Sequence, residues 1–258
     1  MDKPLLSKRI VVTRPQAQAA SFCQKLAEAG AIPVRFPTIR ITPMPDTQRL
    51  DAALRRLPDY AWIIFTSVNG VAYCWDRLAT VASTRLPASL RVAAIGPATA
   101  QALRERQVVP DYVPAEFVAE RIAEGLGAVA GQAILLPRAE AARKTLATLL
   151  ADQGARVDEI PVYRTVPEAP SPEAFAALDA GVDVLTFTSS STVRHYDALV
   201  AGRALRGVQE ALVACIGPIT AETAHSLGYE VATVADEYTT DGLIRALERY
   251  FVDLNGRG

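Results

Sequence analysis

The chain is poor in the residues that most metal and redox sites require. Its 258 residues include 3 cysteines and 2 histidines. Cys23, Cys74 and Cys215 are far apart and form no CxxC pair, and Cys215 lies in a hydrophobic run that is typical of a small buried residue. The pattern favours neither a disulfide framework nor a metal site. No metal is therefore expected.

Other common signals are also missing. Neither GxxxxGK[ST] nor GxGxxG occurs, so a nucleotide cofactor has no support and no cofactor is expected. The net charge of −1 gives no global field for nucleic acid or membranes. No apolar run approaches the roughly 20 residues of a membrane span, and Lys8 and Arg9 lead directly into a strand instead of a signal peptide. A cytoplasmic protein without nucleic-acid or membrane partners is expected.

Lysine is scarce as well. Of 27 basic residues, Lys3, Lys8, Lys25 and Lys144 are lysines and the others are arginines. The planar guanidinium suits carboxylate or phosphate recognition better than a point ammonium does. A codon preference for arginine explains the same bias, so the composition leaves both interpretations open.

What the chain does contain is an internal repeat. Phe-Thr-Ser at 65–67 recurs at 187–189, and Ile-Gly-Pro-Ala-Thr-Ala at 95–100 recurs as Ile-Gly-Pro-Ile-Thr-Ala at 216–221. The period is about half the chain, far longer than the roughly 20 to 50 residues of a solenoid repeat. An internal duplication into two similar units is therefore predicted.

Hydrophobic periodicity predicts alternating strands and helices. Such alternation favours an α/β fold with parallel sheets covered on both faces, each unit a flavodoxin-like layer sandwich. Extended segments at 33–43 and 157–165 are the expected crossings between units and could pair as a stiff hinge. The expected strands are 9–13, 61–65, 91–95, 133–136, 182–187 and 211–216, and the expected helices are 17–28, 50–57, 69–78, 98–106, 117–126, 143–153, 192–199, 219–227 and 240–250.

Hydroxyl residues and glycines gather where strands lead into helices, the edge at which open α/β sheets bind ligands. Free N–H groups at helix N-termini accept anions. Plain helix capping is the competing interpretation for each junction. The candidate ligand residues at these junctions are Thr66, Ser67, Asn69, Thr99, Ser189, Ser190, Ser191, Gly217 and Thr220.

Three longer side chains are further candidates. Arg14 and Arg138 occupy matching strand ends, where a guanidinium can bind a ligand carboxylate or pair with an acid of its own unit. Tyr163 stands on the second extended segment, where its phenol could donate a proton or serve only as a half-buried hinge aromatic. The sequence leaves both readings of each residue open.

Eight short motifs follow one another along the chain. They are Val-Val-Thr-Arg-Pro (11–15), Phe-Thr-Ser-x-Asn-Gly-Val (65–71), Ile-Gly-Pro-Ala-Thr-Ala (95–100), Leu-Pro-Arg (136–138), Val-Tyr-Arg-Thr (162–165), Phe-Thr-Ser-Ser-Ser-Thr-Val (187–193), Ile-Gly-Pro-Ile-Thr-Ala (216–221) and Glu-Tyr-Thr-Thr-Asp-Gly-Leu (237–243). Each motif is short and weak, whereas their joint order and spacing are specific. Taken together, the motifs resemble the uroporphyrinogen-III synthase family from about residue 8 to residue 251.

This resemblance implies a two-domain organisation. One domain would consist of residues 1–36 plus 168–258, the other of 42–160, with 37–41 and 161–167 as linker strands. The implied reaction is a hydro-lyase cyclisation of hydroxymethylbilane to uroporphyrinogen III, with loss of water and inversion of ring D, without cofactor, in heme biosynthesis.

The resemblance also implies roles for residues. Tyr163, Thr99 and Thr220 match positions implicated in activity, and the Thr-Ser turns match backbone that contacts the substrate. A monomer with transient contact to hydroxymethylbilane synthase is expected. The alternative is a non-catalytic, two-domain, hinge-closing binding protein for a polycarboxylate ligand, against which the expected absence of a signal peptide counts.

Overall fold

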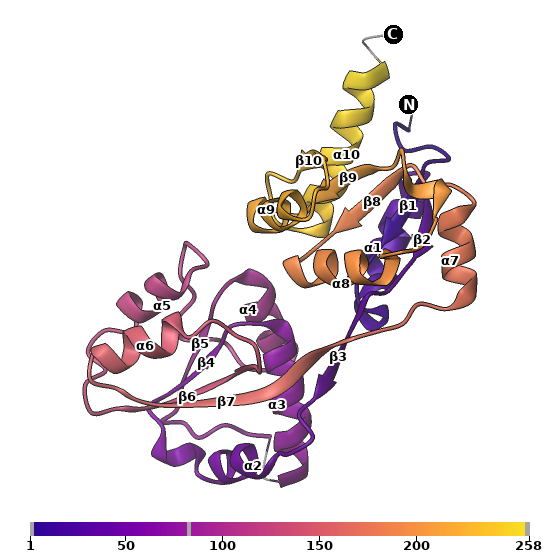
Figure 1. The fold of residues 1–258 in the computed structure, drawn as a ribbon. Coiled ribbons are helices and arrows are strands. Elements are labelled where there is room, and N and C mark those ends of the chain that lie inside the picture. Colours follow the sequence, from indigo (N-terminus) through magenta and orange to yellow (C-terminus); the bar gives the residue numbers. More distant parts are fainter. Residues whose placement is uncertain (1–2, 82–83, 256–258) are drawn as a thin grey trace. The chain divides into compact units, whose positions relative to one another are not determined.

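Two α/β units make up the chain in the computed structural model, which describes residues 3–81 and 84–255. Unit 1 consists of Met1–Arg40 and Val166–Gly258, and unit 2 of Ile41–Thr165. Each unit contains one sheet dominated by parallel strands (Figure 1). The expected α/β class with parallel sheets is therefore confirmed.

The sheet of unit 1 has the spatial order β10-β9-β8-β1-β2. Numbered along the chain within the unit, this is the 2-1-3-4-5 order of flavodoxin-like sheets. Every recorded pairing in it is parallel, including that of β1 with β8, which are far apart in the sequence (indigo and orange in Figure 1). The strands are β1 (Arg9–Val12), β2 (Ile32–Arg35), β8 (Val184–Phe187), β9 (Leu212–Cys215) and β10 (Val231–Val234).

Helices cover both faces of this sheet. Side chains alternate along β1, so that Ile10 and Val12 pack with α1 and α10 while Val11 packs with α7, α8 and α9. The helices are α1 (Gln16–Glu28), α7 (Pro172–Asp179), α8 (Ser190–Val200), α9 (Pro218–Ser226) and α10 (Thr240–Asn255), with a single 3₁₀ turn at Arg206–Val208.

Unit 2 repeats this layout with two differences among the described residues, an added edge strand β3 beside β7 and a missing fifth parallel strand. Its sheet has the order β3-β7-β6-β4-β5, and the fifth parallel position is reduced to an isolated bridge between Ala93 and Tyr112. Helices α2, α3 and α4 cover one face, and α5 and α6 cover the other. The elements are β3 (Ile39–Pro43), β4 (Trp62–Phe65), β5 (Arg91–Ala94), β6 (Ala133–Ala139), β7 (Arg156–Pro167), α2 (Gln48–Arg55), α3 (Val68–Val81), α4 (Pro97–Arg104), α5 (Ala119–Gly125) and α6 (Thr145–Asp152), with a 3₁₀ turn at Leu57–Asp59.

Two equivalent helices end in the same way. Gly30 after α1 has φ +94° and Gly154 after α6 has φ +85°, a conformation that favours glycine. The following N–H groups, of Ala31 and Ala155, return to carbonyls within their helices at 3.0 Å. Each helix therefore stops at its glycine and leads directly into the next strand.

The structure corrects several local expectations. The segment expected to be extended at 33–43 is split between β2 in one sheet and β3 in the other. The helix expected at 117–126 begins only at Ala119, which leaves Phe117 in a loop. Helix α7 and strand β10 were not expected. Ser171 caps α7 and Pro172 opens it, a signal present in the sequence, whereas β10 is a short, half-buried strand with no strong hydrophobic run.

Candidate functional site

The carboxyl ends of the parallel strands in unit 2 carry Thr66 and Ser67, directly after β4. Ser67 Oγ accepts the backbone N–H of Gly70 at 2.9 Å, in the first turn of α3. Asn69 lies in the same turn and, like Thr66, is half-buried. Ser67 is therefore a helix cap, which was the competing interpretation of this junction in the sequence. Its hydroxyl also makes a second contact.

That second contact is with Tyr163 on β7. The two hydroxyl oxygens are 3.1 Å apart. The Tyr163 ring stacks on Tyr73 with centroids 5.8 Å apart, and Tyr73 in turn donates to the carbonyl of Ile41 at 2.9 Å. Tyr163 is 8% exposed. The phenol is thus held at the carboxyl edge by a ring on one side and a capping serine on the other.

Arg138 lies near the end of β6, beside β7, and is 6% exposed. Its Nη1 is 3.2 Å from Glu159 Oε1, an ion pair without hydrogen-bond geometry, and its Nη2 donates to the carbonyl of Arg143. Burial lowers the pKa of Arg138, and the Glu159 carboxylate opposes that effect. In this structure Arg138 is therefore engaged inside its own unit, and a role in binding ligand stays a prediction.

In unit 1 the corresponding edge holds a network of hydroxyls. Ser189 Oγ accepts the N–H of Thr192, and Ser189 Oγ and Ser191 Oγ are 2.9 Å apart. Thr223, in the second turn of α9, donates to Ser190 Oγ at 2.8 Å, and Ser190 Oγ is 3.3 Å from the carbonyl oxygen of Ile219 in the first turn of α9. Ser189 is a cap, while Ser190 belongs to a bridge between two helix N-termini.

The two Gly-Pro turns differ from the serine junctions. Gly96 and Gly217 occupy the N-cap positions of α4 and α9 and cap without a side chain. Thr99 and Thr220, in the first turns of these helices, are 4% and 5% exposed. In the described part of the chain, neither hydroxyl has a recorded hydrogen-bond partner. Capping therefore does not account for these two threonines.

Arg14 follows β1 and lines a cavity of about 310 Å³ together with Arg35 and Glu168. Its Nη2 donates to Gln18 Oε1 at 3.3 Å, while its Nε is buried without a partner among the described residues. Burial lowers the pKa of Arg14. Arg14 therefore keeps an unused donor at this edge of unit 1, and the Glu168 carboxylate lines the same cavity.

Known proteins are similar to this chain in sequence and in fold. The family model described as uroporphyrinogen-III synthase HemD matches residues 20–245. The chain belongs to the uroporphyrinogen-III synthase family. It is 35% identical to the uroporphyrinogen-III synthase of Synechococcus elongatus, over 96% of this chain and 97% of that protein. It is 31% identical to the porphyrin biosynthesis protein HemD of Ruminiclostridium josui, over 96% of this chain and 49% of that protein.

Solved structures agree on the fold. Uroporphyrinogen-III synthases from Thermus thermophilus and Helicobacter pylori each have a TM-score of 0.63 to this chain, at 19% and 15% identity. The matches cover 96% and 98% of this chain and 100% of each of those chains. The expected family, with its cyclising lyase of porphyrin biosynthesis, is confirmed.

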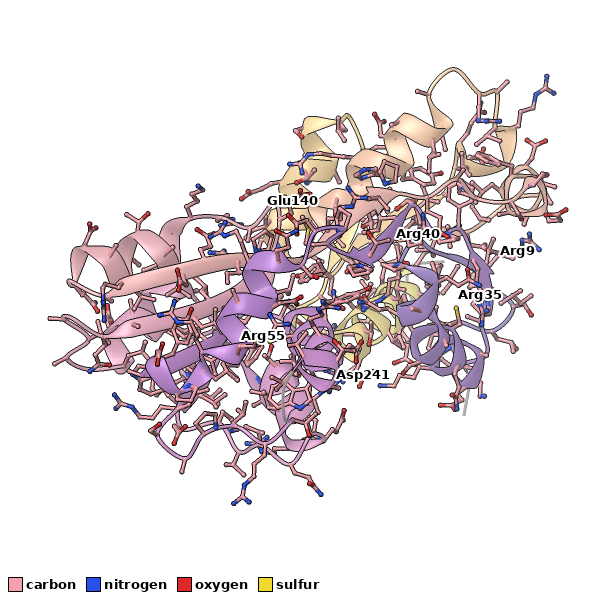
Figure 2. All side chains as sticks on the ribbon, turned by 90° about the horizontal axis from the view of Figure 1, so that it is seen from below. Arg9, Arg35, Arg40, Arg55, Glu140 and Asp241 are labelled. Atoms are coloured by element: carbon pink, nitrogen blue, oxygen red, sulfur yellow. The ribbon has the colours of Figure 1, made fainter. Side chains whose placement is uncertain are left out.

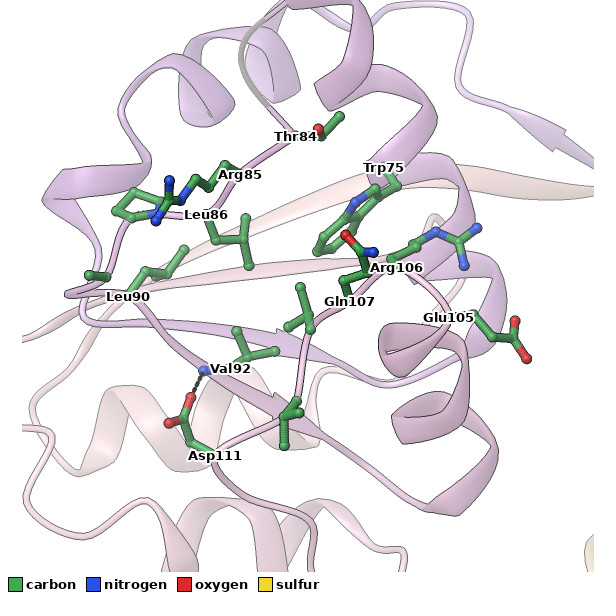
Figure 3. A pocket seen from close by; sticks show the side chains of 14 residues that line it. Trp75, Thr84, Arg85, Leu86, Leu90, Val92, Glu105, Arg106, Gln107 and Asp111 are labelled. Carbon is green, nitrogen blue, oxygen red and sulfur yellow. Dashed lines mark hydrogen bonds between the residues drawn. The ribbon is translucent and has the colours of Figure 1, made fainter.

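One cavity of this uroporphyrinogen-III synthase family member lies away from the carboxyl edges of the sheets. A cavity of about 780 Å³ in unit 2 lies near the start of β5, lined by Trp75, Arg106 and Asp111 among others (Figure 3). Asp111 accepts the N–H of Val92 there at 2.7 Å. The cavity lies at the opposite strand ends from Ser67, so it does not define the candidate site.

The structure also shows where arginines lie and whether metal-ligating side chains gather. Arginines lie on both units, and Arg35 and Arg55 are two exposed ones (Figure 2). Within residues 3–81 and 84–255, no group of three His, Cys, Asp or Glu side chains could hold a metal ion. No helix in that part of the chain is long and apolar enough to cross a membrane.

Sequence reasoning missed three residues of these networks. Glu159 pairs with Arg138, Tyr73 stacks on Tyr163, and Thr223 joins the second turn of α9 to the first turn of α8. Tyr73 and Thr223 lie on predicted helices, whose spacing identifies a buried face but not the partner across it. Glu159 lies two residues before the pairing partner of Arg138, so a correct strand register alone could have revealed it.

The contact between Ser67 and Tyr163 should stabilise unit 2. A double-mutant cycle of Ser67→Ala and Tyr163→Phe is expected to give a coupling free energy of about 0.5–1.5 kcal/mol, because each substitution removes one partner of a mostly buried hydrogen bond. Urea unfolding followed by tryptophan fluorescence measures it, since Trp62 and Trp75 both lie in unit 2. A cycle with the exposed Ser89→Ala in place of Ser67→Ala should be additive. Coupling near zero in both cycles would contradict a stabilising contact.

Proposed function

We propose that this chain converts hydroxymethylbilane into uroporphyrinogen III, closing the macrocycle with loss of water and inversion of ring D. Membership of the uroporphyrinogen-III synthase family supports the reaction. The observation that carries a site is the pair Tyr163 and Ser67, a phenol and a capping hydroxyl 3.1 Å apart at the carboxyl edge of a parallel sheet.

We infer that the two units arose by duplication and that β3 and β7 form a two-stranded linker. The support is the shared sheet order and the matching sets of helices on each face. Two hydrogen bonds, from Met44 N to the Val162 carbonyl and from Glu168 N to the Thr38 carbonyl, have the register of an antiparallel pair. Each of these bonds lies within one unit, and the chain passes from unit to unit between them.

The substrate's chemistry requires anion-accepting points that are spread out. A linear tetrapyrrole with eight carboxylates needs many spaced contacts, and helix N-termini with arginines supply them without one dense patch. Arg14, with its unused Nε, and the first turns of α3 and α8 are our candidates. The proposed substrate-binding residues are Arg14, Thr66, Ser67, Asn69, Arg138, Ser189, Ser190, Ser191 and Gly217.

Tyr163 is the proposed group beside the leaving hydroxyl. Ser67 Oγ already accepts the Gly70 N–H, so its own proton is available for the phenol oxygen. If Ser67 donates, the Tyr163 O–H is left to face the substrate and can donate a hydrogen bond or proton to the departing hydroxyl. Proton donation of this kind contributes about 10² to 10⁴ in rate.

The harder task for the enzyme is to select which of two carbons of ring D forms the new bond. Loss of the ring A hydroxyl as water leaves an electrophilic azafulvene, and ring D attacks it through its substituted α-carbon to give a spiro intermediate that fragments and recloses. Closure at the unsubstituted position gives the type I isomer without the enzyme. The selection between these carbons depends on how the two rings are held, which is a matter of positioning more than of acid strength.

The cellular setting is also a proposal. All three cysteines are free and buried, which is compatible with a reducing compartment such as the cytoplasm. Because the substrate cyclises spontaneously, transient contact with hydroxymethylbilane synthase would shorten its exposure to water. The monomeric state stays a prediction.

Isomer analysis separates the enzyme from a polycarboxylate-binding protein. With freshly made hydroxymethylbilane, we expect mainly uroporphyrinogen III, detected by chromatography after oxidation. Product of type I alone, formed at the rate of a sample without protein, would instead favour the non-catalytic binding protein.

Tyr163→Phe is expected to lower kcat by about tenfold or more, which corresponds to at least about 1.4 kcal/mol. An interaction made mainly in the transition state appears in kcat with a smaller change in KM. Tyr112→Phe is the matched control in unit 2, because its hydroxyl donates to the Arg121 carbonyl at 2.9 Å. Full activity of Tyr163→Phe would leave Tyr163 as a stacked hinge aromatic.

The two equivalent threonines are expected to differ. A substrate with unlike ends presents its leaving group to one of them, and we expect Thr220→Ala to reduce turnover more than Thr99→Ala. Steady-state kinetics with isomer analysis measures both, and Thr80→Ala on the exposed side of α3 is the control. Wild-type turnover and isomer ratio in both variants would remove the threonines from the catalytic assignment.

A further inference from the structure

Only two aromatic side chains in the chain are exposed. The seven phenylalanines, eight tyrosines and two tryptophans all lie in the described residues, and among them Phe117 is 56% exposed and Tyr238 is 66% exposed while every other ring is buried or half-buried. Phe117 precedes α5 in unit 2, and Tyr238 precedes α10, the counterpart of α5 in unit 1. The two rings thus occupy equivalent places in the two units.

Each ring lies against the glycine of a Gly-Pro turn. A Cβ added to Gly96 would be 3.1 Å from Cδ1 of Phe117, and one added to Gly217 would be 3.2 Å from Cδ1 of Tyr238. Both glycines have extended backbone, with φ of −173° and −176°, which any residue adopts. What glycine permits at these positions is therefore the close approach of the ring.

The loops that carry the rings are built alike. The N–H of Val118 donates to the Glu116 carbonyl at 2.9 Å, and the N–H of Thr239 donates to the Glu237 carbonyl at 2.7 Å. Each bond closes a three-residue turn centred on the aromatic residue, and neither centre has positive φ, as in inverse γ-turns.

The glutamate of each loop is also paired. Glu116 is 3.4 Å from an Arg121 nitrogen of α5, and Glu237 is 2.6 Å from an Arg245 nitrogen of α10. Because each ring packs against a glycine and its loop is paired with the next helix, the exposed part of each ring is held in a defined place. Binding to such a ring requires little additional ordering.

We propose that Phe117 and Tyr238 are substrate-binding residues, each stacking on a pyrrole ring of the linear tetrapyrrole. The proposal rests on the proposed function. The turns on which the rings lie also begin the helices that carry Thr99 and Thr220, so each ring belongs to the same carboxyl edge as the chemistry assigned above. Arginines and helix N-termini recognise the carboxylates, but the pyrrole faces are apolar and aromatic and need a surface of the same kind.

Substitutions that keep or remove the ring test the proposal. Tyr238→Leu and Phe117→Leu are expected to raise KM for hydroxymethylbilane about two- to tenfold, the range of a lost aromatic pair. They should also raise the share of type I product, since substrate that is held poorly cyclises in solution. Tyr238→Phe and Phe117→Tyr keep the stacking face and should behave like the wild type.

Controls separate binding from folding. Val252→Ala on α10 and Val109→Ala beside the cavity of Figure 3 alter exposed apolar residues elsewhere and should leave KM unchanged. Gly217→Ala and Gly96→Ala, whose new methyl group displaces the ring by a few tenths of an ångström, should raise KM without removing the ring. Thermal unfolding of every variant shows whether the fold is retained.

Three outcomes would overturn the stacking role while wild-type protein still makes type III product. These are wild-type KM and isomer ratio in both leucine variants, equal losses in Tyr238→Phe and Tyr238→Leu, and a lowered Tm in the leucine variants that accounts for their loss of activity. Failure of the wild type to make type III product would instead contradict the proposed function itself. The two failures are therefore distinguishable.

Discussion

Parallel pairing of strands is the constraint on which the rest of the structure depends. Because the recorded pairings among β1, β2, β8, β9 and β10 all run the same way, their carboxyl ends meet at one edge of unit 1. The same is true of β4, β5, β6 and β7 in unit 2. Strands such as β1, β4, β8 and β9 then lead into a helix whose first N–H groups have no partner within that helix. Serine hydroxyls and Gly-Pro turns stand at this edge because backbone geometry places unsatisfied polar groups there.

Much of this arrangement could be predicted from the sequence. Runs such as those of β1 and β4 are apolar and β-branched, and the repeat of their flanking motifs indicated both the fold class and the edge that carries Ser67, Ser189 and Gly217. The double alternation of strand and helix leaves few other architectures. The fold class therefore followed from local patterns that agree with the structure, and the site residues stay a prediction.

Other features depend on contacts that no local pattern encodes. The segment at 33–43 reads as one extended run, yet Phe36 is fully buried in unit 1 while β3 belongs to the other sheet. Phe117 fits the apolar spacing of a helix, but the close approach to Gly96 holds it in a loop. The sequence leaves open whether Arg138 binds a ligand or pairs with an acid of its own unit, and in space it is paired with Glu159. In each case the partner is set by strand register or by a turn, which periodicity does not reveal.

Chain connectivity differs between the units although their layers match. Unit 2 is one uninterrupted segment, whereas β1 of unit 1 pairs with β8, the central strand of its sheet, which comes after that segment in the chain. The backbone N–H of Arg9 donates to Asp183 at 2.7 Å. During synthesis from the N-terminus, β1 and β2 therefore emerge long before the strand that completes their sheet. Unit 2 can close its core as soon as β7 has emerged, while the first 40 residues stay without their sheet until α7 and β8 follow. The order of assembly is thus the reverse of the order of translation for this part of the molecule, and the early strands depend on a late one.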